Sequence, residues 1–183
     1  MSTDEAIETR QLTLDELGLI AEIDRSEQID ALYVQRGTRL ELQRGDWSAP
    51  AWDPSGKGEH SVAGQQAALE RLVRDGAIAL GAFAADRLVG IGVVVTQLRP
   101  GIAQLAYLHV TSGQRARGIG GSLSDELEGI AREAGDSSMV VSATPSLNTV
   151  RFYRRRGYEP MAEPLPELLE LEPEDVHMAK VLR

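Results

Sequence analysis

One stretch of the chain, from Leu105 to Leu123, constrains the fold more than any other. It begins as an apolar, β-prone run that ends at Val110, and it finishes as the start of an amphipathic helix. The turn between them carries two arginines and three closely spaced glycines: Arg115, Arg117, Gly118, Gly120 and Gly121. A strand–turn–helix unit of this kind directs unpaired backbone N–H groups and the positive end of a helix dipole at one point, and its glycines let a ligand approach the main chain. The stretch therefore predicts a site for a phosphate or pyrophosphate group.

The glycine spacing in this turn distinguishes between the common types of phosphate-binding loop. A dinucleotide-binding fingerprint needs a third glycine three places after Gly120, and that position is Leu123. A P-loop needs a Gly-Lys-Ser/Thr sequence, and the turn contains no lysine. What remains is Arg115-x-x-Gly118-x-Gly120, which on its own fits either a cofactor loop or a plain glycine-rich connection with surface arginines.

A second stretch supplies a matching pattern further along the chain. Ser138–Ala143 is another short apolar strand, and it is followed by Asn148, by a helix that carries Tyr153, and by the pair Gly157 and Tyr158. We call the glycine-rich turn and this second stretch the two half-motifs. They follow each other along the chain with one helix between them. Together they resemble the acetyl-CoA site of the GNAT superfamily of N-acetyltransferases.

The resemblance implies an α/β (α+β) fold with a mixed, mostly antiparallel central sheet and helices on both faces. It also implies one parallel strand–helix–strand unit, formed by the strand that ends at Val110 and by Ser138–Ala143. The likeness covers most of the chain and is strongest from Gly76 to Tyr158. Because 183 residues suit one domain, we expect residues 1–183 to form a single N-acetyltransferase domain.

Hydrophobic periodicity and turn residues predict the remaining elements. Helices are expected over Thr13–Asp24, Val62–Arg74, Ile119–Ala134 and Leu147–Arg155. Besides the strand that ends at Val110, strands are expected over Ile7–Leu12, Ile29–Gln35, Thr38–Gln43, Ala77–Ala84, Leu88–Gln97, Ser138–Ala143, Tyr158–Met161 and Val176–Leu182. Two segments are expected to be loops, Arg44–Gly58 and Ala162–Asp175. The first carries two tryptophans, which either line a binding site or pin the loop to the core.

Charge and residue usage exclude several classes of function. A formal net charge of −9 argues against nucleic-acid binding, and it suits either a cationic substrate such as an amine or simply a solvated acidic surface. The chain has no cysteine, and its three histidines lack the spacing of metal ligands, so we expect no metal site. No apolar run approaches the ~18 residues of a membrane span, and we see no signal peptide, so we expect a cytoplasmic location and no membrane partner.

The resemblance also implies where acetyl-CoA is held. Backbone N–H groups of the glycine-rich turn would anchor its pyrophosphate, which assigns Arg115, Ala116, Arg117, Gly118, Ile119, Gly120, Gly121 and Ser122 to the cofactor. The pantetheine arm would pair with Leu108 to Val110 as an added strand does. Asn148 matches the residue that hydrogen-bonds this arm, although an asparagine in the first turn of a helix is also a common capping arrangement.

The same resemblance assigns catalytic roles. The backbone N–H of Leu108, beside a bulge, would meet the developing oxyanion. Tyr153 matches the general acid that protonates the departing thiolate, and the alternative is a tyrosine packed against the neighbouring strand. The base stays open: some relatives use a glutamate where this chain has Gln104. His109 has a suitable ordinary pKa but also fits a structural role. A third route gives the proton to water or to a distant carboxylate such as Glu27 or Asp30.

These features predict an acyltransferase that moves the acetyl group of acetyl-CoA directly to a primary amine of a small molecule or peptide. With no cysteine and no other evident nucleophile, attack in a ternary complex is favoured over an acetyl-enzyme. A non-catalytic acyl-CoA-binding module on the same fold is the alternative, and a structural domain is a third. The sequence identifies neither the acceptor nor other acyl donors, and association into a homodimer stays open.

Overall fold

The computed structural model describes residues 6–115 and 117–183. Seven strands form the central sheet in the order β1-β4-β5-β6-β7-β9-β8. Their bounds are β1 Ile7–Gln11, β4 Ile78–Ala84, β5 Arg87–Arg99, β6 Ile102–Val110, β7 Ser138–Ala143, β9 Val176–Val181 and β8 Glu159–Pro160. Neighbouring strands pair antiparallel, except that β6 and β7 pair parallel. The expected mixed, mostly antiparallel sheet with one parallel unit is therefore confirmed.

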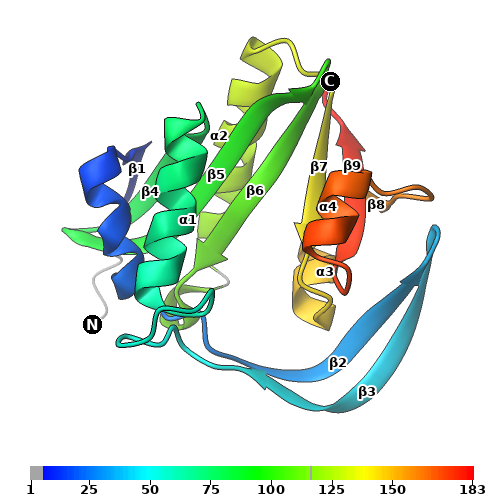
Figure 1. Ribbon diagram of the computed structural model, residues 1–183, viewed down its shortest axis with the longest axis horizontal. Helices are drawn as coiled ribbons and strands as arrows, with labels where there is room; N and C mark the ends of the chain where they lie inside the picture. The colour runs from blue at the N-terminus through cyan, green and yellow to red at the C-terminus, as the bar shows by residue number, and fades with distance from the viewer. Residues whose placement is uncertain (1–5, 116) are drawn as a thin grey trace.

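Helices cover both faces of this sheet, as Figure 1 shows. Their bounds are η1 Leu14–Glu22, α1 Val62–Arg74, η2 Ser112–Gln114, α2 Ile119–Glu133, α3 Leu147–Arg155 and α4 Pro166–Leu171. One core lies between the sheet and η1 and α1, and includes Leu17, Leu69 and Ile91. A second core lies on the face that α2 and α3 cover, and includes Leu123 and Val150. None of the described helices is long and apolar enough to cross a membrane.

Small residues on β5 set how closely α2 approaches the sheet. A Cβ added at Gly90 would lie 2.9 Å from Cγ2 of Ile119, and one added at Gly92 would lie 2.6 Å from Cδ1 of Leu127. Ile119, Leu123 and Leu127 recur every four residues and are buried, so this stripe of α2 faces β5. The first turn of α2 is thereby fixed against the end of β6.

The strands β6 and β7 diverge after a short paired stretch. Their parallel pairing runs from Ile102 opposite Ser138 to Gln104 opposite Val140, and no pairing between them follows among the described residues. Figure 1 shows the two strands separating towards the carboxyl end of β6. On its other side, β6 stays paired with β5, and the register shift between Leu105 and Tyr107 marks a bulge. Among the described residues, the β7-facing edge of β6 beyond Gln104 is therefore left without a strand partner.

A hairpin of β2 (Glu27–Arg36) and β3 (Arg39–Ala49) forms a separate two-stranded sheet. It extends beneath the opening between β6 and β7 (Figure 1). The N–H of Tyr33 donates to the carbonyl of Pro145 over 2.8 Å, and the Gln35 side chain bonds the main chain of Met161 and His177. The hairpin therefore spans from the η1 side of the sheet to the segment that follows β7.

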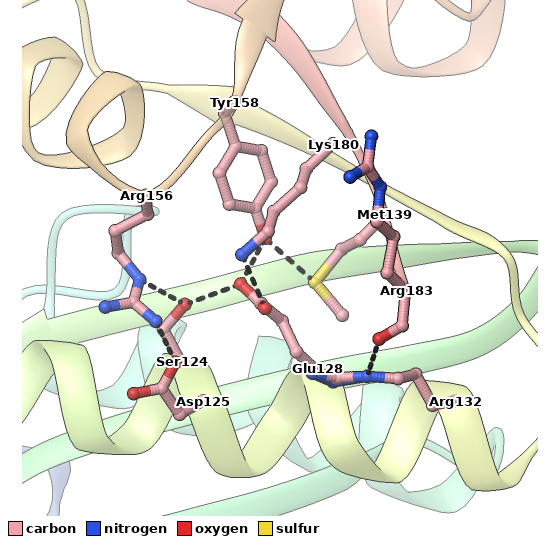
Figure 2. A network of polar contacts seen from close by, with 9 residues as sticks. All are labelled: Ser124, Asp125, Glu128, Arg132, Met139, Arg156, Tyr158, Lys180 and Arg183. Atoms are coloured by element: carbon pink, nitrogen blue, oxygen red, sulfur yellow. Dashed lines mark hydrogen bonds and ion pairs between the residues drawn. The ribbon is translucent and has the colours of Figure 1, made fainter.

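A polar network holds α2 against β9 and the end of α3 (Figure 2). The carboxylate of Glu128, only 2% exposed, accepts from Lys180 over 2.7 Å and from the hydroxyls of Ser124 and Tyr158 over 3.4 Å each. Arg156 donates to the Ser124 hydroxyl over 3.1 Å and pairs with Asp125. The network therefore connects α2 to β9 and to the residues that follow α3.

Three sequence predictions differ from the structure. The predicted helix over Thr13–Asp24 is a 3-10 helix over Leu14–Glu22, and Thr13 and Glu16 form a capping box at its start. The predicted loop Arg44–Gly58 is wrong in its first part, because β3 runs on to Ala49. The predicted loop Ala162–Asp175 contains α4, which begins with a proline and buries Leu168.

Candidate functional site

The glycine-rich turn connects β6 to α2 as the sequence predicts. The N–H of Thr111 donates to the carbonyl of Val89 over 2.9 Å, which keeps the turn attached to β5. Gly118 has φ of +80°, a conformation that favours glycine, and α2 begins at the next residue. The first bond of α2 runs from the Ser122 N–H to the Gly118 carbonyl over 2.9 Å, so the N–H groups just before Ser122 have no helical carbonyl to bind. These free donors and the helix dipole favour an anion.

The two arginines of the turn bind protein groups. Arg115 donates to the carbonyl of Arg25 over 3.1 Å and to that of Val110 over 3.3 Å. Arg117 donates to the side chain of Gln114 over 2.5 Å. Ala116 lies outside the described residues. The amides rather than the guanidinium groups are therefore the direct anion donors that this turn offers.

The two predicted half-motifs meet at Gly120. A Cβ added there would lie 3.5 Å from Cγ2 of Val110 and 3.6 Å from the ring of Phe152, so β6, α2 and α3 converge at this point. Leu108 and Val110 are half-buried against the core on the α2 side, while Gly121 is half-buried and Gly118 and Ser122 are exposed.

Asn148 lies in the first turn of α3 and is exposed. Its Nδ2 donates to Oε1 of Glu27 over 3.1 Å, and Oε2 of Glu27 lies 3.9 Å from Nη1 of Arg115. The helix cap itself comes from Ser146, whose hydroxyl accepts from the N–H of Thr149 over 3.3 Å. Glu27 therefore links the two half-motifs, a contact that no sequence pattern indicates.

Tyr153 is only 5% exposed, with its ring centroid 5.1 Å from that of Phe152 and 5.3 Å from that of Tyr158. Within residues 6–115 and 117–183, its hydroxyl has no hydrogen-bond partner. Burial raises its pKa well above the ordinary value, and the charge of Asp175 adds to the increase. Burial and the charge of Glu172 raise the pKa of Asp175 itself to about 7. The phenol is therefore protonated throughout the physiological range.

His109 lies on β6 opposite Ile91, on the face away from α2. Its ring centroid is 4.6 Å from that of Tyr107 and 5.6 Å from that of Trp52. Burial lowers its pKa to about 4, and the charges of Arg25 and Arg115 contribute. His109 is therefore neutral at pH 7, able to accept a proton but a weak base.

Gln104, at the position of the relatives' glutamate, and Asp30, one of the two carboxylates left open, lie elsewhere, as do the other two histidines. Gln104 is the last β6 residue that pairs with β7, and Asp30 is exposed on the hairpin. His60 is exposed, while His177 is buried and bonded to the Ser142 hydroxyl and the Glu172 carbonyl. Among the described residues, no group of three or more histidine, aspartate or glutamate side chains is arranged to hold a metal ion.

Three residues that sequence reasoning did not select surround this site. Arg25 and Tyr107 carry no local motif, and Asp175 was only one of several acidic residues in a predicted loop. The tryptophan content of Arg44–Gly58 was a usable signal, because Trp52 is 8% exposed and contacts His109. The assigned catalytic and cofactor roles stay predictions.

Comparison with known proteins gives a family and a set of similar folds. Residues 52–170 match the family described as an acetyltransferase (GNAT) domain. The chain is similar to nourseothricin acetyltransferase, at 17% identity and a TM-score of 0.73, over 97% of this chain and 99% of that one. It is similar to a putative streptothricin acetyltransferase from Bacillus anthracis in complex with acetyl coenzyme A, at 15% identity and a TM-score of 0.67, over 95% and 96%.

A third similar structure is the PaiA N-acetyltransferase from Thermoplasma acidophilum in complex with coenzyme A. It has 18% identity and a TM-score of 0.63, over 96% of this chain and 99% of that one. At these identities the likenesses show the fold. No curated protein matched the sequence.

Proposed function

The chain belongs to the GNAT acetyltransferase family, and from this premise we propose that it transfers the acetyl group of acetyl-CoA to a primary amine of a small molecule or peptide. The observation that carries the proposal is the unpaired edge of β6 beyond Gln104, which lies beside the free amide groups at the start of α2. An extended arm that ends in a pyrophosphate fits both features at once.

The residues present suit acetyl-CoA. The amides from Arg115 to Ser122 would hold the pyrophosphate, with the positive end of the α2 dipole behind them. Leu108 and Val110 would offer main-chain groups to the pantetheine arm. Structures of similar fold contain coenzyme A or acetyl-CoA, which supports this assignment. Bound acetyl-CoA supplies an activated thioester.

In the proposed reaction, the N–H of Leu108 donates to the thioester carbonyl oxygen and stabilises the negative charge that develops there. The bulge beside Leu108 supports this role, because bulges redirect main-chain groups. Tyr153 holds a proton for the departing sulfur, and its raised pKa keeps that proton in place until the thiolate forms.

Removal of the proton from the amine is assigned to His109. Its neutral form is the one that can accept a proton, and the low pKa implies that the proton passes on to solvent rather than staying on the ring. Two carboxylates, Glu27 and Asp30, stay open as alternatives. Of these, Glu27 contacts a residue of each half-motif, Arg115 and Asn148.

A free-thiol release assay with acetyl-CoA and a panel of small amines, polyamines and peptides tests the proposal, with calorimetric titration of coenzyme A run in parallel. Binding together with release for at least one amine supports it. If coenzyme A binds and no amine gives release, the chain is the non-catalytic binding module instead. If coenzyme A neither binds nor raises the melting temperature, the cofactor assignment fails.

A further inference from the structure

Among the described residues, two buried hydrogen-bond donors lack partners, and the side chains that carry them pack against each other beside His109. They are Nε of Arg25, in the segment between η1 and β2, and Nε1 of Trp52, in the segment between β3 and α1. We propose that Arg25 and Trp52 form a subsite for a carboxylate of the acceptor, so that the acceptor carries both an amine and an acidic group. This inference rests on the proposed acetyl transfer.

The two side chains pack against each other. The guanidinium carbon of Arg25 lies 4.2 Å from the centroid of the Trp52 ring, a cation–π contact that holds the cation beside the indole. Trp52 is 8% exposed, and both nitrogen atoms are buried without a hydrogen bond. A buried donor left unpaired is unfavourable, so a group that accepts from both nitrogen atoms gains hydrogen bonds that the free protein lacks.

Nearby negative charges do not neutralise Arg25. Within the two described segments of the chain, Arg25 forms no ion pair. The carboxylate of Asp24 accepts from the N–H of Ser26 over 2.9 Å, and Glu27 is bonded to Asn148. The field of Arg25 and Arg115 instead acts on His109. These two cations therefore contribute a positive potential at His109, in a protein whose formal net charge is −9.

The aromatic surroundings strengthen this potential. Tyr107 and His109 contact each other, and His109 contacts Trp52 edge to face. The hydroxyl of Tyr107 donates to Oε1 of Gln65 over 2.5 Å, so it is already occupied. Rings of this kind exclude water and lower the local dielectric, which makes the attraction between a cation and a carboxylate stronger than in bulk solvent.

The side of the sheet favours the acceptor over the cofactor as the source of the carboxylate. Leu108 and Val110 pack on the α2 side, where the pyrophosphate site is proposed, whereas Tyr107 packs on the opposite side with η1 and α1. His109 follows Leu108 directly in the sequence and touches Trp52. A carboxylate bound by the Arg25 side chain would therefore lie close to the proposed reacting centre, on the side of the sheet opposite to α2, while the Arg25 main chain accepts a hydrogen bond from Arg115 of the turn.

Matched acceptors test the proposal. Lysine, lysinamide and cadaverine are compared, because lysinamide neutralises the carboxylate and cadaverine lacks it. We expect lysine to have a kcat/KM at least tenfold above the other two. Arg25→Gln should remove this preference, lowering kcat/KM for lysine about 10- to 100-fold through KM while cadaverine changes less than twofold. Arg25→Lys should retain part of the preference for lysine. Trp52→Phe, which keeps an aromatic ring but removes the N–H, should reduce this preference less than Arg25→Gln does.

Control measurements distinguish an acceptor subsite from a structural role and from a cofactor-phosphate site. Arg39→Gln, at an exposed position on the hairpin, should leave all three acceptors unchanged. Equal losses for lysine and cadaverine would make Arg25 structural and overturn the proposal. A weaker affinity for acetyl-CoA in Arg25→Gln, measured by calorimetry, would assign the cation to a cofactor phosphate and also overturn it.

A binding measurement that needs no turnover distinguishes a failure of this inference from a failure of the proposed function. Nε-acetyllysine should raise the melting temperature of the wild-type chain more than N-acetylcadaverine does, and Arg25→Gln should abolish the difference. The difference is expected whether or not thiol is released, and its absence in the wild-type chain would contradict the carboxylate subsite.

Discussion

Asn148 and Glu27 lie 121 positions apart in the sequence, yet Nδ2 of Asn148 donates a hydrogen bond to Oε1 of Glu27 over 3.1 Å. Asn148 belongs to the first turn of α3, and Glu27 begins β2. The bond therefore joins the hairpin to the helix that follows β7. The bond uses one of the two Nδ2 hydrogens of Asn148, so the other hydrogen and Oδ1 are available to a bound arm.

Substitutions at this contact distinguish a role of Asn148 in cofactor binding from a purely structural role. If Asn148 bonds the pantetheine arm, Asn148→Ala should weaken coenzyme A binding about fivefold, which corresponds to one hydrogen bond of about 1 kcal/mol. Glu27→Gln should leave the affinity unchanged or increase it. Calorimetric titration measures both. Equal stability losses in the two variants, with unchanged affinity, would mean that the contact only holds the hairpin in place.

Replacement of Tyr153 by phenylalanine should lower kcat by about 10²- to 10³-fold, because the thiolate must then leave without a positioned proton donor. The dissociation constant of coenzyme A should stay within twofold, since the buried ring keeps its contacts with Phe152 and Tyr158. Steady-state kinetics and calorimetry test this together. A variant with wild-type kcat would rule out the acid role.

The lowered pKa of His109 makes stability depend on pH. Between pH 4 and 6.5 the unfolded chain binds a proton on this residue and the folded chain does not, so the free energy of unfolding falls as the pH is lowered through that window. His109→Gln should remove this part of the slope. Urea denaturation of both proteins at pH 7, 6, 5 and 4 measures the difference, and parallel curves would contradict the neutral, buried state.

Gly118 should tolerate substitution worse than its neighbour Gly113. Both have open space where a Cβ would go, but only Gly118 has a positive φ, of +80°. Gly118→Ala is expected to lose about 1 kcal/mol of stability and to weaken coenzyme A binding about tenfold, because the turn must shift. Gly113→Ala should change neither by more than a small amount. Denaturation and titration of both variants make the comparison.

The buried carboxylate of Glu128 depends on Lys180. Lys180→Met should destabilise the fold by about 2–3 kcal/mol, because it leaves a carboxylate that is 2% exposed without its cation. Adding Glu128→Gln to that variant should recover part of the loss. Urea denaturation checks both proteins. The kcat should change little in either, since neither Glu128 nor Lys180 is among the residues assigned to acetyl-CoA or to the transfer step.

The sequence predicted best where local residues decide the structure. The start of α2 after Gly118 and the strand–turn–helix order around it follow from glycine conformation and hydrophobic spacing, and both are confirmed. The continuation of β3 to Ala49 was missed because the strand is exposed along almost its whole length, so no alternation marks it. The 3-10 geometry of η1 left no signal that separates it from an α-helix.

The residues of the candidate site also fall into those that local sequence predicts and those that it does not. Tyr153 and the turn could be located from residue types and spacing, because each lies within one motif. The contact of Arg25 with Trp52 and that of Glu27 with Asn148 could not, because each joins segments that only the folded chain brings together.

The hairpin of β2 and β3 is a sheet of its own, and among the described residues its hydrogen bonds to the rest of the molecule come from β2, through Glu27, Tyr33 and Gln35. The exposed strand β3 can therefore vary in composition with little effect on the seven-stranded sheet. Exchanging β3 between homologous chains accordingly tests whether this strand affects acceptor choice while the seven-stranded sheet stays the same.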